Sequence, residues 1–366
     1  MSHPIDAGTR IAETIPAFSA ESLLCDLVAT DSPSGDESRA VAHLVDWMGA
    51  HGATRATRDA AGNAIGEFGT GARQIVLLGH IDTFGAALPV HTDGRVLHGR
   101  GAVDAKGSLC AFAAAAAIAH ADGTIPTDAR VIVIGAVEEE SASSKGAHYA
   151  VRQYAPSACL IGEPSSWDRI TLGYKGRLIA RWTWRGGLAH SAGQIASPGD
   201  RAVAFCNRVR AWVDRHNAGI ERVFGRIDAT VQAIYSGSDG VVGWSDVTIG
   251  LRLPPGVMPE SAAELIAALT EDGTVTCSGH ERAIVADKDT TVTRALRGAI
   301  REQGGTPAFV HKTGTSDMNI VGRLWDCPIA AYGAGDSALD HTPEERIDLD
   351  EYVRAVRVLA SAIPRL

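Results

Sequence analysis

The chain has 366 residues, a length at which two domains are expected because a single hydrophobic core rarely grows that large. Its formal net charge of -9 and the lack of a basic tract argue against general nucleic-acid binding. The six cysteines are scattered singly, with no CxxC pair, so we expect free thiols in a reducing compartment, the cytoplasm. The first 18 residues carry acids and prolines instead of the apolar core of a signal peptide, and no apolar run is long enough to cross a bilayer. We therefore expect neither export nor membrane insertion.

Helical and apolar strand patterns alternate in the first half of the chain. Ser19–Ala29 has a helical pattern, and Ser34-x-x-Glu37 predicts a capping box that begins a second helix, which ends near Gly52. The next predicted elements are a strand at 65–68, a strand from 75 to 80, an Ala-rich helix to about 120, a strand at 130–137, a helix at 145–154 and a strand at 158–161. This alternation predicts an α/β domain with a mostly parallel sheet, whose ligand site should lie beyond the carboxyl ends of the strands.

From about residue 178 the pattern changes. The predicted order there is strand, helix, strand, strand, helix, strand, which is typical of a ferredoxin-like unit. Helices at 290–302 and 349–362 and a strand at 329–332 then resemble the first domain again. We therefore predict a discontinuous catalytic domain of residues 1–178 and 289–366, with an inserted domain of residues 179–288.

The strand that ends at His80 presents reactive side chains at its exit. Alternate side chains of an extended backbone point the same way, so His80 and Asp82 should share a face. Asp82 can then hold one ring nitrogen of His80 while the other nitrogen binds a metal ion. The alternative is a histidine that only caps a turn, since a lone histidine is weak evidence of a ligand.

More ionisable residues lie at the ends of the other strands of this domain: Asp104, Glu139, Glu140, Glu163 and, late in the chain, His341. Two imidazoles and several carboxylates at one sheet edge would repel one another unless a cation neutralised them, so a pair of divalent metal ions is expected. Such a pair leaves one residue free to act as general base toward a water molecule, as in amide hydrolysis without a protein nucleophile. Taken one at a time, these acids could instead be solvated loop carboxylates.

The motifs around these residues resemble the M20 metallopeptidase-type amidohydrolases, a family that includes acetylornithine deacetylase and succinyl-diaminopimelate desuccinylase. The resemblance covers nearly the whole chain and runs through Gly79–Thr83, Gly99–Gly107, Glu138–Glu140, Gly162–Ser165 and His341. It implies a catalytic domain with two divalent metal ions, for which zinc is the first choice and cobalt or manganese could use the same ligands.

The resemblance also implies a role for each residue of the site. The implied metal ligands are His80 and Glu163 for one ion, Glu140 and His341 for the other, and Asp104 for both. Asp82 would be the carboxylate behind His80, and Glu139 the general base. The family usually shows Asp-Glu-Glu where this chain has three glutamates. A slip of one residue would therefore make Glu138 the base and Glu139 the ligand.

The insertion resembles the family's lid and dimerisation domain, which implies a homodimer. His190, within the run Gly187–Ser191, matches the histidine that reaches the partner subunit's active site and stabilises the tetrahedral oxyanion. Arg252 matches the arginine that binds a substrate carboxylate. A loop of the first domain matches the segment that holds this carboxylate through amides and hydroxyls, with Thr313, Gly314, Thr315 and Ser316. As alternatives, His190 could cap a strand end and Arg252 could be a solvated surface residue.

Other enzyme classes fit the sequence poorly. The triplet Lys312–Gly314 also occurs in serine β-lactamases, yet no Ser-x-x-Lys is present, which argues against a serine acyl-enzyme. Neither a Gly-x-Ser-x-Gly elbow nor a P-loop occurs. A non-catalytic metal-binding homologue remains as an alternative of a different class.

Four runs look most like the family's hydrolases that release lysine or ornithine from an amino-group carrier protein, at 162–168, 171–178, 312–319 and 335–342. This resemblance implies hydrolysis of an amide bond to the carrier's terminal glutamate. Such carriers are acidic, so a local basic patch would have to attract one to this acidic chain; the candidates are Arg100, Lys175, Arg177 and Lys312. The alternative substrate is a small N-acyl amino acid such as N-acetylornithine, whose deacetylation or desuccinylation needs no patch.

Overall fold

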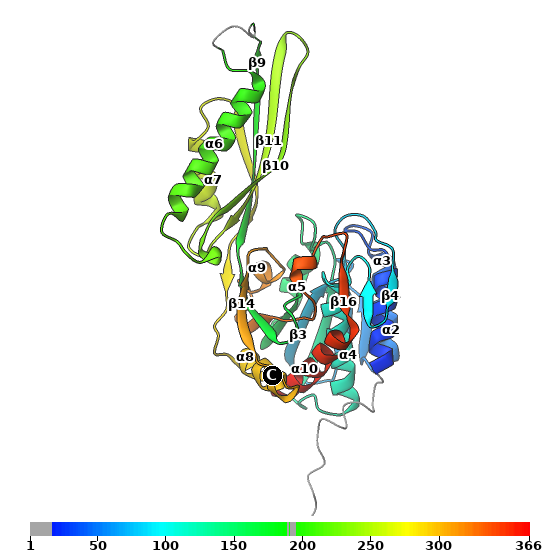
Figure 1. The fold of residues 1–366 in the computed structure, drawn as a ribbon. Coiled ribbons are helices and arrows are strands. Elements are labelled where there is room, and N and C mark those ends of the chain that lie inside the picture. The colour runs from blue at the N-terminus through cyan, green and yellow to red at the C-terminus, as the bar shows by residue number, and fades with distance from the viewer. Residues whose placement is uncertain (1–16, 189, 191–194) are drawn as a thin grey trace, which may run out of the picture. The chain divides into compact units, whose positions relative to one another are not determined.

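A computed structural model describes residues 17–188, 190 and 195–366 of the chain (Figure 1). The predictions for the N-terminal segment before residue 17, and the matches at Ala189 and Ser191, lie outside the described residues. The chain forms two compact units. The first contains the residues up to Gly173, Ala286–Val310 and Ser316–Leu366, and the second contains Tyr174–Val285 and His311–Thr315.

The segment His311–Thr315 was predicted to lie in the first domain, but the structure groups it with the second unit. Two hydrogen bonds explain this difference. The backbone N–H of Lys175 donates to the carbonyl of Lys312 at 3.2 Å, and Nη1 of Arg252 donates to Oγ1 of Thr315 at 2.9 Å.

A mixed sheet forms the centre of the first unit. Its strands are β1 (Arg55–Arg58), β2 (Ala64–Phe68), β3 (Arg73–His80), β6 (Ala129–Ala136), β7 (Ala158–Gly162), β8 (Arg169–Tyr174), β14 (Ala308–Lys312) and β15 (Ile329–Ala331). The spatial order is β1-β2-β6-β3-β7-β15-β8, with β14 also paired to β8. The strands β6, β3, β7 and β15 are parallel, while β2 and β8 join them antiparallel. The predicted largely parallel α/β sheet is thus confirmed.

Helices cover both faces of this sheet, which explains the continuous apolar run of β3. The helices of the unit are α2 (Ala17–Ala29), α3 (Ser38–Ala50), α4 (Lys106–Ala121), α5 (Lys145–Gln153), α8 (Thr291–Glu302), α9 (Met318–Val321) and α10 (Leu349–Ala362). Ile75 and Leu77 belong to one core cluster with residues of α4 and α10, and the intervening Val76 and Leu78 are equally buried. A separate small sheet contains β4 (His91–Asp93), β5 (Val96–His98) and β16 (Arg346–Asp348).

Two glycines let the start of α4 approach the sheet closely. Gly79 of β3 and Gly162 of β7 are partners in register. A Cβ at Gly162 would lie 2.9 Å from Cε2 of Phe112, and one at Gly79 would lie 3.3 Å from Cβ of Leu109. Both α4 side chains are buried, so larger residues at the two glycines would push the helix outward. The close packing brings Asp104, two residues before α4, to the strand end that carries His80.

The second unit is a four-stranded antiparallel sheet with two helices (Figure 1). Its elements are β9 (Gly176–Gly187), α6 (Pro198–Asn217), the short 3₁₀ turn Val223–Gly225, β10 (Asp228–Ser238), β11 (Val242–Leu253), α7 (Pro259–Ala268), β12 (Thr274–Glu281) and the short strand β13 (Ile284–Val285). The sheet order is β10-β11-β9-β12. The predicted βαββαβ order is therefore confirmed, and the unit has its own core, centred on Trp182 and Phe205.

None of the helices among the described residues is long and apolar enough to cross a membrane. All six cysteines are free, as their scattered spacing predicts.

Candidate metal centre

Strand register brings the predicted ligands of the first unit to one edge of the sheet. His80, the last residue of β3, pairs with Ala136 at the end of β6, and Gly79 pairs with Gly162 at the end of β7. The segments that follow these strands therefore leave the sheet at the same edge. They carry Asp82, Glu139, Glu140 and Glu163.

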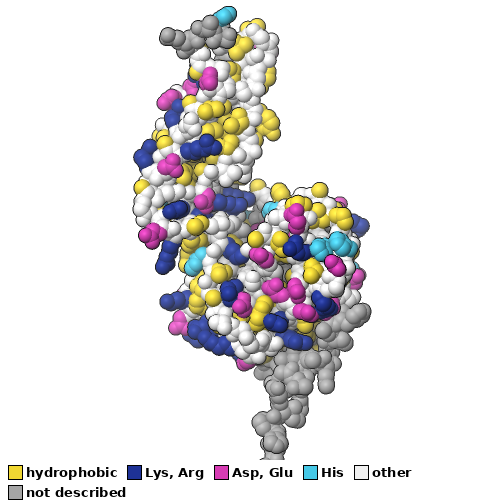
Figure 2. All heavy atoms as spheres, in the orientation of Figure 1, with side chains coloured by type: hydrophobic (Ala, Val, Ile, Leu, Met, Phe, Trp, Pro, Cys, Tyr) yellow, Lys and Arg dark blue, Asp and Glu magenta, His cyan; other side chains and the backbone are white. Residues whose placement is uncertain are grey.

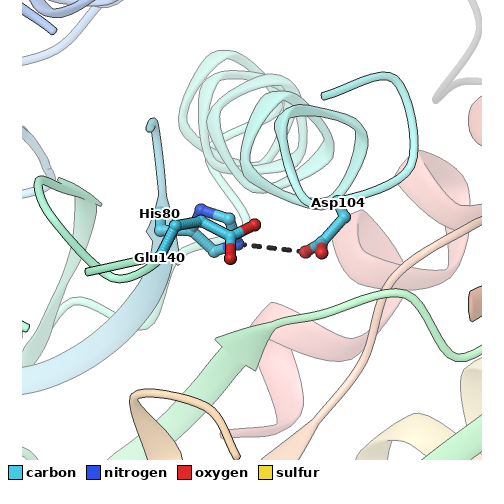
Figure 3. A group of neighbouring side chains, drawn as sticks. All are labelled: His80, Asp104 and Glu140. Atoms are coloured by element: carbon cyan, nitrogen blue, oxygen red, sulfur yellow. Dashed lines mark hydrogen bonds and ion pairs between the residues drawn. The ribbon is translucent and has the colours of Figure 1, made fainter. Parts of the chain in front are cut away.

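The side chains of His80, Asp104 and Glu140 form a compact group (Figure 3). One ligand atom each from His80, Asp104 and Glu140 lies within 4.8 Å of the others. Nε2 of His80 is 3.2 Å from Oδ1 of Asp104, the contact drawn in Figure 3. The His80 ring is buried, and Asp104 arrives from the turn before α4.

His341 joins this group from the far end of the chain. Its Nε2 is 3.0 Å from Oδ2 of Asp104 and 3.0 Å from Oε1 of Glu140. The ring of Phe84 stacks on the imidazole with centroids 4.3 Å apart. Hydrogen bonds to Asp104 and Glu140 raise the pKa of His341 to about 10, against the opposing effect of burial. The two carboxylates therefore favour the protonated form of this imidazole.

Asp82 contacts His80, but not only in the way the strand pattern predicts. Nδ1 of His80 is 3.0 Å from the main-chain carbonyl of Asp82 and 3.4 Å from its carboxylate oxygen Oδ1. The carboxylate also accepts the backbone N–H groups of Glu139 at 3.1 Å and Glu140 at 3.0 Å. Asp82 thus holds both the histidine and the turn that carries the two glutamates. The sequence carries no local signal for this second role, because the partners are 57 and 58 residues apart.

The capping box predicted at Ser34 and Glu37 is wrong. The helix begins at Ser38 with no side-chain cap, because both side chains have partners near the site. The Ser34 hydroxyl donates to Oδ2 of Asp82 at 2.6 Å. Oε1 of Glu37 accepts the backbone N–H of Glu138 at 3.2 Å. The turn before α3 therefore supports the site instead of the helix.

The three consecutive glutamates occupy different environments. Glu138 has a left-handed backbone (φ 59°), and its carboxylate faces Lys145 at 3.2 Å, where a hydrogen bond from Ser143 keeps its pKa low. Burial raises the pKa of Glu139 well above its ordinary value. Burial also raises the pKa of Glu140, although His341 opposes that shift.

Glu163 adds another carboxylate, which is partly buried. Burial raises its pKa well above the ordinary range, and the charges of Asp104, Asp340 and Asp317 act in the same direction, against the opposing effect of His80. Asp317 and Asp340 were not singled out from the sequence. Asp340 directly precedes His341, but neither its spacing nor its flanking residues distinguish it from a solvated loop acid.

The donor set fits a pair of divalent cations. Buried carboxylates that raise one another's pKa are costly unless positive charge compensates them. Imidazole and carboxylate donors within a few ångströms of one another match the preferences of zinc, and also suit cobalt and manganese. The residues at this edge therefore fit such ions, because they offer imidazole and carboxylate donors together with excess negative charge.

The remaining predicted residues belong to the second unit or border it. His190 is exposed beyond the end of β9, and Arg252 lies in β11 with its guanidinium on the Thr315 hydroxyl. Thr313 is exposed and Gly314 half-buried. Ser316 is buried: its N–H donates to Oδ1 of Asn319, and its hydroxyl accepts the N–H of Met318. Its amide therefore already has a partner within the protein.

Three of the four candidates for a basic patch are engaged in ion pairs. Arg100 pairs with Glu345 at 2.7 Å, Arg177 with Glu281 at 2.5 Å, and the fully buried Lys175 with Asp228 at 2.6 Å. On the face drawn in Figure 2, Lys and Arg side chains are interspersed with Asp and Glu in each unit. The charges of Arg100, Lys175 and Arg177 are therefore each offset by a neighbouring acid.

Comparisons with known proteins agree with the site. The sequence model of Peptidase family M20/M25/M40 matches residues 76–365. The chain is 50% identical over 361 residues to the LysW-lysine hydrolase of Deinococcus radiodurans, covering 96% of this chain and 98% of that one. It is 28% identical over 305 residues to the LysW-lysine/LysW-ornithine hydrolase of Sulfurisphaera tokodaii, covering 81% and 82% of the two chains.

Solved structures show the same fold. An M20 family metallo-carboxypeptidase from Sulfolobus solfataricus matches with a TM-score of 0.78 at 17% identity, covering 94% of this chain and 98% of that one. A dinuclear metal-binding M20 peptidase from Bacillus subtilis matches with a TM-score of 0.69 at 12% identity, covering 95% and 97%. The chain belongs to Peptidase family M20/M25/M40 and is a metal-dependent hydrolase of amide bonds, as the family match and the 50% identity to a hydrolase over nearly the whole length of both chains show.

Proposed function

We propose that this enzyme releases lysine, or ornithine, from an amide conjugate with an amino-group carrier protein of the LysW kind, in lysine or arginine biosynthesis in the cytoplasm. The observation that carries the proposal is the group of His80, Asp104 and Glu140, which could hold a metal ion, in a chain with 50% identity to a LysW-lysine hydrolase over almost its full length. A non-catalytic role fits poorly, because every expected type of ligand is present at the sheet edge.

Contacts in the first unit support the proposed metal ligands. Asp104 has one carboxylate oxygen near His80 and the other near His341, as expected of a residue that bridges two ions. His80 and Glu163 would hold one ion, and Glu140 and His341 the other, with zinc as the first choice. When bound, the two ions supply a lowered pKa for a water molecule and polarisation of the scissile carbonyl.

Glu139 is the proposed general base. Its carboxylate takes a proton from the attacking water and returns it to the nitrogen of the leaving amine. Burial raises the pKa of Glu139, which suits a group that must hold a proton and then release it. Glu138, by contrast, is tied to Lys145 and has a lowered pKa, which supports the register in which Glu139 is the base and Glu140 the ligand.

The second unit is the proposed lid and dimerisation domain. His190 would serve the active site of the partner subunit in a homodimer by stabilising the oxyanion. Arg252 would bind the carboxylate of the released amino acid, together with the loop Thr313–Ser316, because a guanidinium suits a carboxylate in bidentate geometry. The contact between Arg252 and Thr315 already links two of these residues.

The substrate can be tested directly. Pure, metal-loaded enzyme should be assayed side by side on N-acetyl-ornithine, N-acetyl-lysine and a carrier-linked lysine. The proposal expects the highest kcat/KM on the carrier conjugate. An equal or higher value on free N-acetyl-ornithine would reject the carrier substrate and favour a deacetylase of small N-acyl amino acids. Failure to hydrolyse any of the three, with metal bound, would favour a non-catalytic homologue.

A further inference from the structure

Glu345 has a carboxylate with no exposed surface, four residues after His341. Its oxygen Oε2 accepts a hydrogen bond from Nη1 of Arg100 at 2.7 Å. Its other oxygen, Oε1, accepts the backbone N–H groups of Val103 at 3.1 Å and Asp104 at 3.2 Å. The roles proposed above for the site do not use this residue.

These contacts join two segments that lie far apart in the chain. The backbone N–H of Gly99 donates to the carbonyl of Glu345 at 3.2 Å, and Nη1 of Arg100 also donates to the carbonyl of Thr342 at 3.2 Å. Just beyond them, β5 pairs with β16. One segment ends in Asp104, and the other begins with His341. The Glu345 carboxylate and the Arg100 guanidinium lie between the two.

We propose that Glu345 and Arg100 act together as positioning residues that hold Asp104 and His341 at the separation needed to bind a metal ion. The proposal rests on the metal assignment made above. A backbone N–H held by a fixed acceptor limits rotation of the Asp104 peptide, and the Arg100 bond to Thr342 fixes the approach of His341. Groups that orient ligands in this way commonly change metal affinity about 10- to 100-fold when they are removed.

The pairing of charges explains why an acid occupies this buried position. A lone buried carboxylate would add a further negative charge beside Asp104 and would be costly to desolvate. Arg100, whose side chain is 11% exposed, neutralises it. A Glu345→Gln side chain keeps an acceptor for the two N–H groups but presents an amide N–H₂ to the guanidinium. Glu345→Gln should therefore weaken the contact with Arg100 while keeping the hydrogen bonds to the two backbone N–H groups.

The test measures metal release as well as turnover. The metal-loaded wild type, Glu345→Gln, Arg100→Met and the double variant are mixed with a chromogenic chelator, and the release of each ion is followed with time. His341→Ala identifies the phase that belongs to the ion held by His341 and Glu140. Glu344→Gln is the matched control, because this neighbouring exposed acid has the same charge change and no side-chain contact with Asp104 among the described hydrogen bonds.

We expect Glu345→Gln and Arg100→Met each to accelerate the release of that ion about 10- to 100-fold, with kcat reduced in parallel and Glu344→Gln unchanged. The double variant should be slower to release metal than Arg100→Met, because it leaves no unpaired buried charge and keeps the acceptor for Asp104. Folding is checked by circular dichroism, and Glu345→Gln alone carries the test if Arg100→Met does not fold.

Three outcomes would overturn the inference. In the first, folded Glu345→Gln releases both ions at the wild-type rate. In the second, the double variant is no better than Arg100→Met, which shows that the two side chains do not act as a pair. In the third, the wild type itself binds no divalent ion, which rejects the metal assignment along with the inference. Only this last outcome affects the proposed function.

Discussion

The Asp82 carboxylate accepts the backbone N–H of Glu139 at 3.1 Å, so the residue that contacts the proposed metal ligand His80 also holds the proposed general base. A second oxygen of the same carboxylate accepts the N–H of Glu140 and the hydroxyl of Ser34. Hydrogen bonds to a carboxylate are stronger than those between neutral groups. The positions of the strand end after β3 and of the turn after β6 are therefore coupled through one side chain.

Ser34→Ala should disturb this coupling without removing any ligand. The hydroxyl hydrogen bond to Asp82 is charge-assisted and part-buried, and such bonds contribute about 1.5–3 kcal/mol. We expect kcat and metal affinity to fall by about tenfold, measured by steady-state kinetics and competition with a chelator. Ser157→Ala, which removes an exposed hydroxyl bonded to the carbonyl of Gln74, should leave both unchanged. Wild-type values for Ser34→Ala would show that Asp82 needs no support from the α3 turn.

Glu139→Gln should abolish turnover while leaving metal content near normal. General acid–base catalysis contributes about 100- to 10,000-fold, so kcat should fall by at least that lower figure. Glu138→Gln should retain activity, since Glu138 is partly exposed and paired with Lys145. Metal content by atomic emission and kcat on one substrate suffice. An active Glu139→Gln together with an inactive Glu138→Gln would reverse the register.

Gly162→Ala should push α4 away from the sheet. The added Cβ would lie 2.9 Å from Phe112 and 3.1 Å from Cα of Gly79, too close without a shift. Overpacking of this kind costs about 1–3 kcal/mol, and the movement should also separate Asp104 from His80. The melting temperature and the metal affinity should therefore both decrease. Gly49→Ala, where the new Cβ meets only Ala56 at 3.6 Å within a helix, is the control and should be neutral or stabilising.

The stability of the metal-free protein should decrease at high pH, where His341 loses its proton. Its pKa of about 10 lies above its ordinary value of 6.5, so the protonated imidazole stabilises the fold. That contribution is fully present below pH 6.5 and is lost as the pH rises through 10. The melting temperature of chelator-treated protein should fall over this range, and His341→Ala should flatten the curve.

Metal binding should displace the proton from His341. Because a histidine must be neutral to bind a metal, loading the protein at pH 8 should release protons, and His341→Ala should release fewer. Calorimetry in two buffers of different ionisation enthalpy measures the difference. Equal proton release by the wild type and His341→Ala would show that His341 is not a ligand.

Hybrid dimers test the proposed role of His190. If His190 serves the partner's site, mixing inactive His190→Ala and Glu139→Gln chains should restore activity, because a mixed dimer contains one intact site. Removing an oxyanion donor costs about 100- to 1000-fold in kcat, so the recovery is measurable. No recovery after confirmed subunit exchange would mean that His190 acts in its own chain or has no catalytic role.

Local patterns predicted most of the elements and the chemical type of the site. The apolar run of β3, the alternation of strands and helices and the βαββαβ order of the second unit depend on neighbouring residues, and all are confirmed. The acids and histidines at strand ends were recognisable because parallel strands bring their carboxyl ends to one edge. Short elements without a hydrophobic pattern were missed, including β4, β5 and β16, each of which has three residues and at most one buried side chain.

The sequence by itself therefore determined the order of the elements and the residue types gathered at the sheet edge. Only the tertiary structure decided which side chains support them. Ser34 has the sequence of a helix cap, yet its hydroxyl bonds to Asp82, 48 residues away. Glu345 contacts the backbone of Asp104 across 241 residues. Such partners leave no mark in a local pattern, because a buried polar group is satisfied by whatever the folded chain brings within hydrogen-bonding distance, regardless of separation in the sequence.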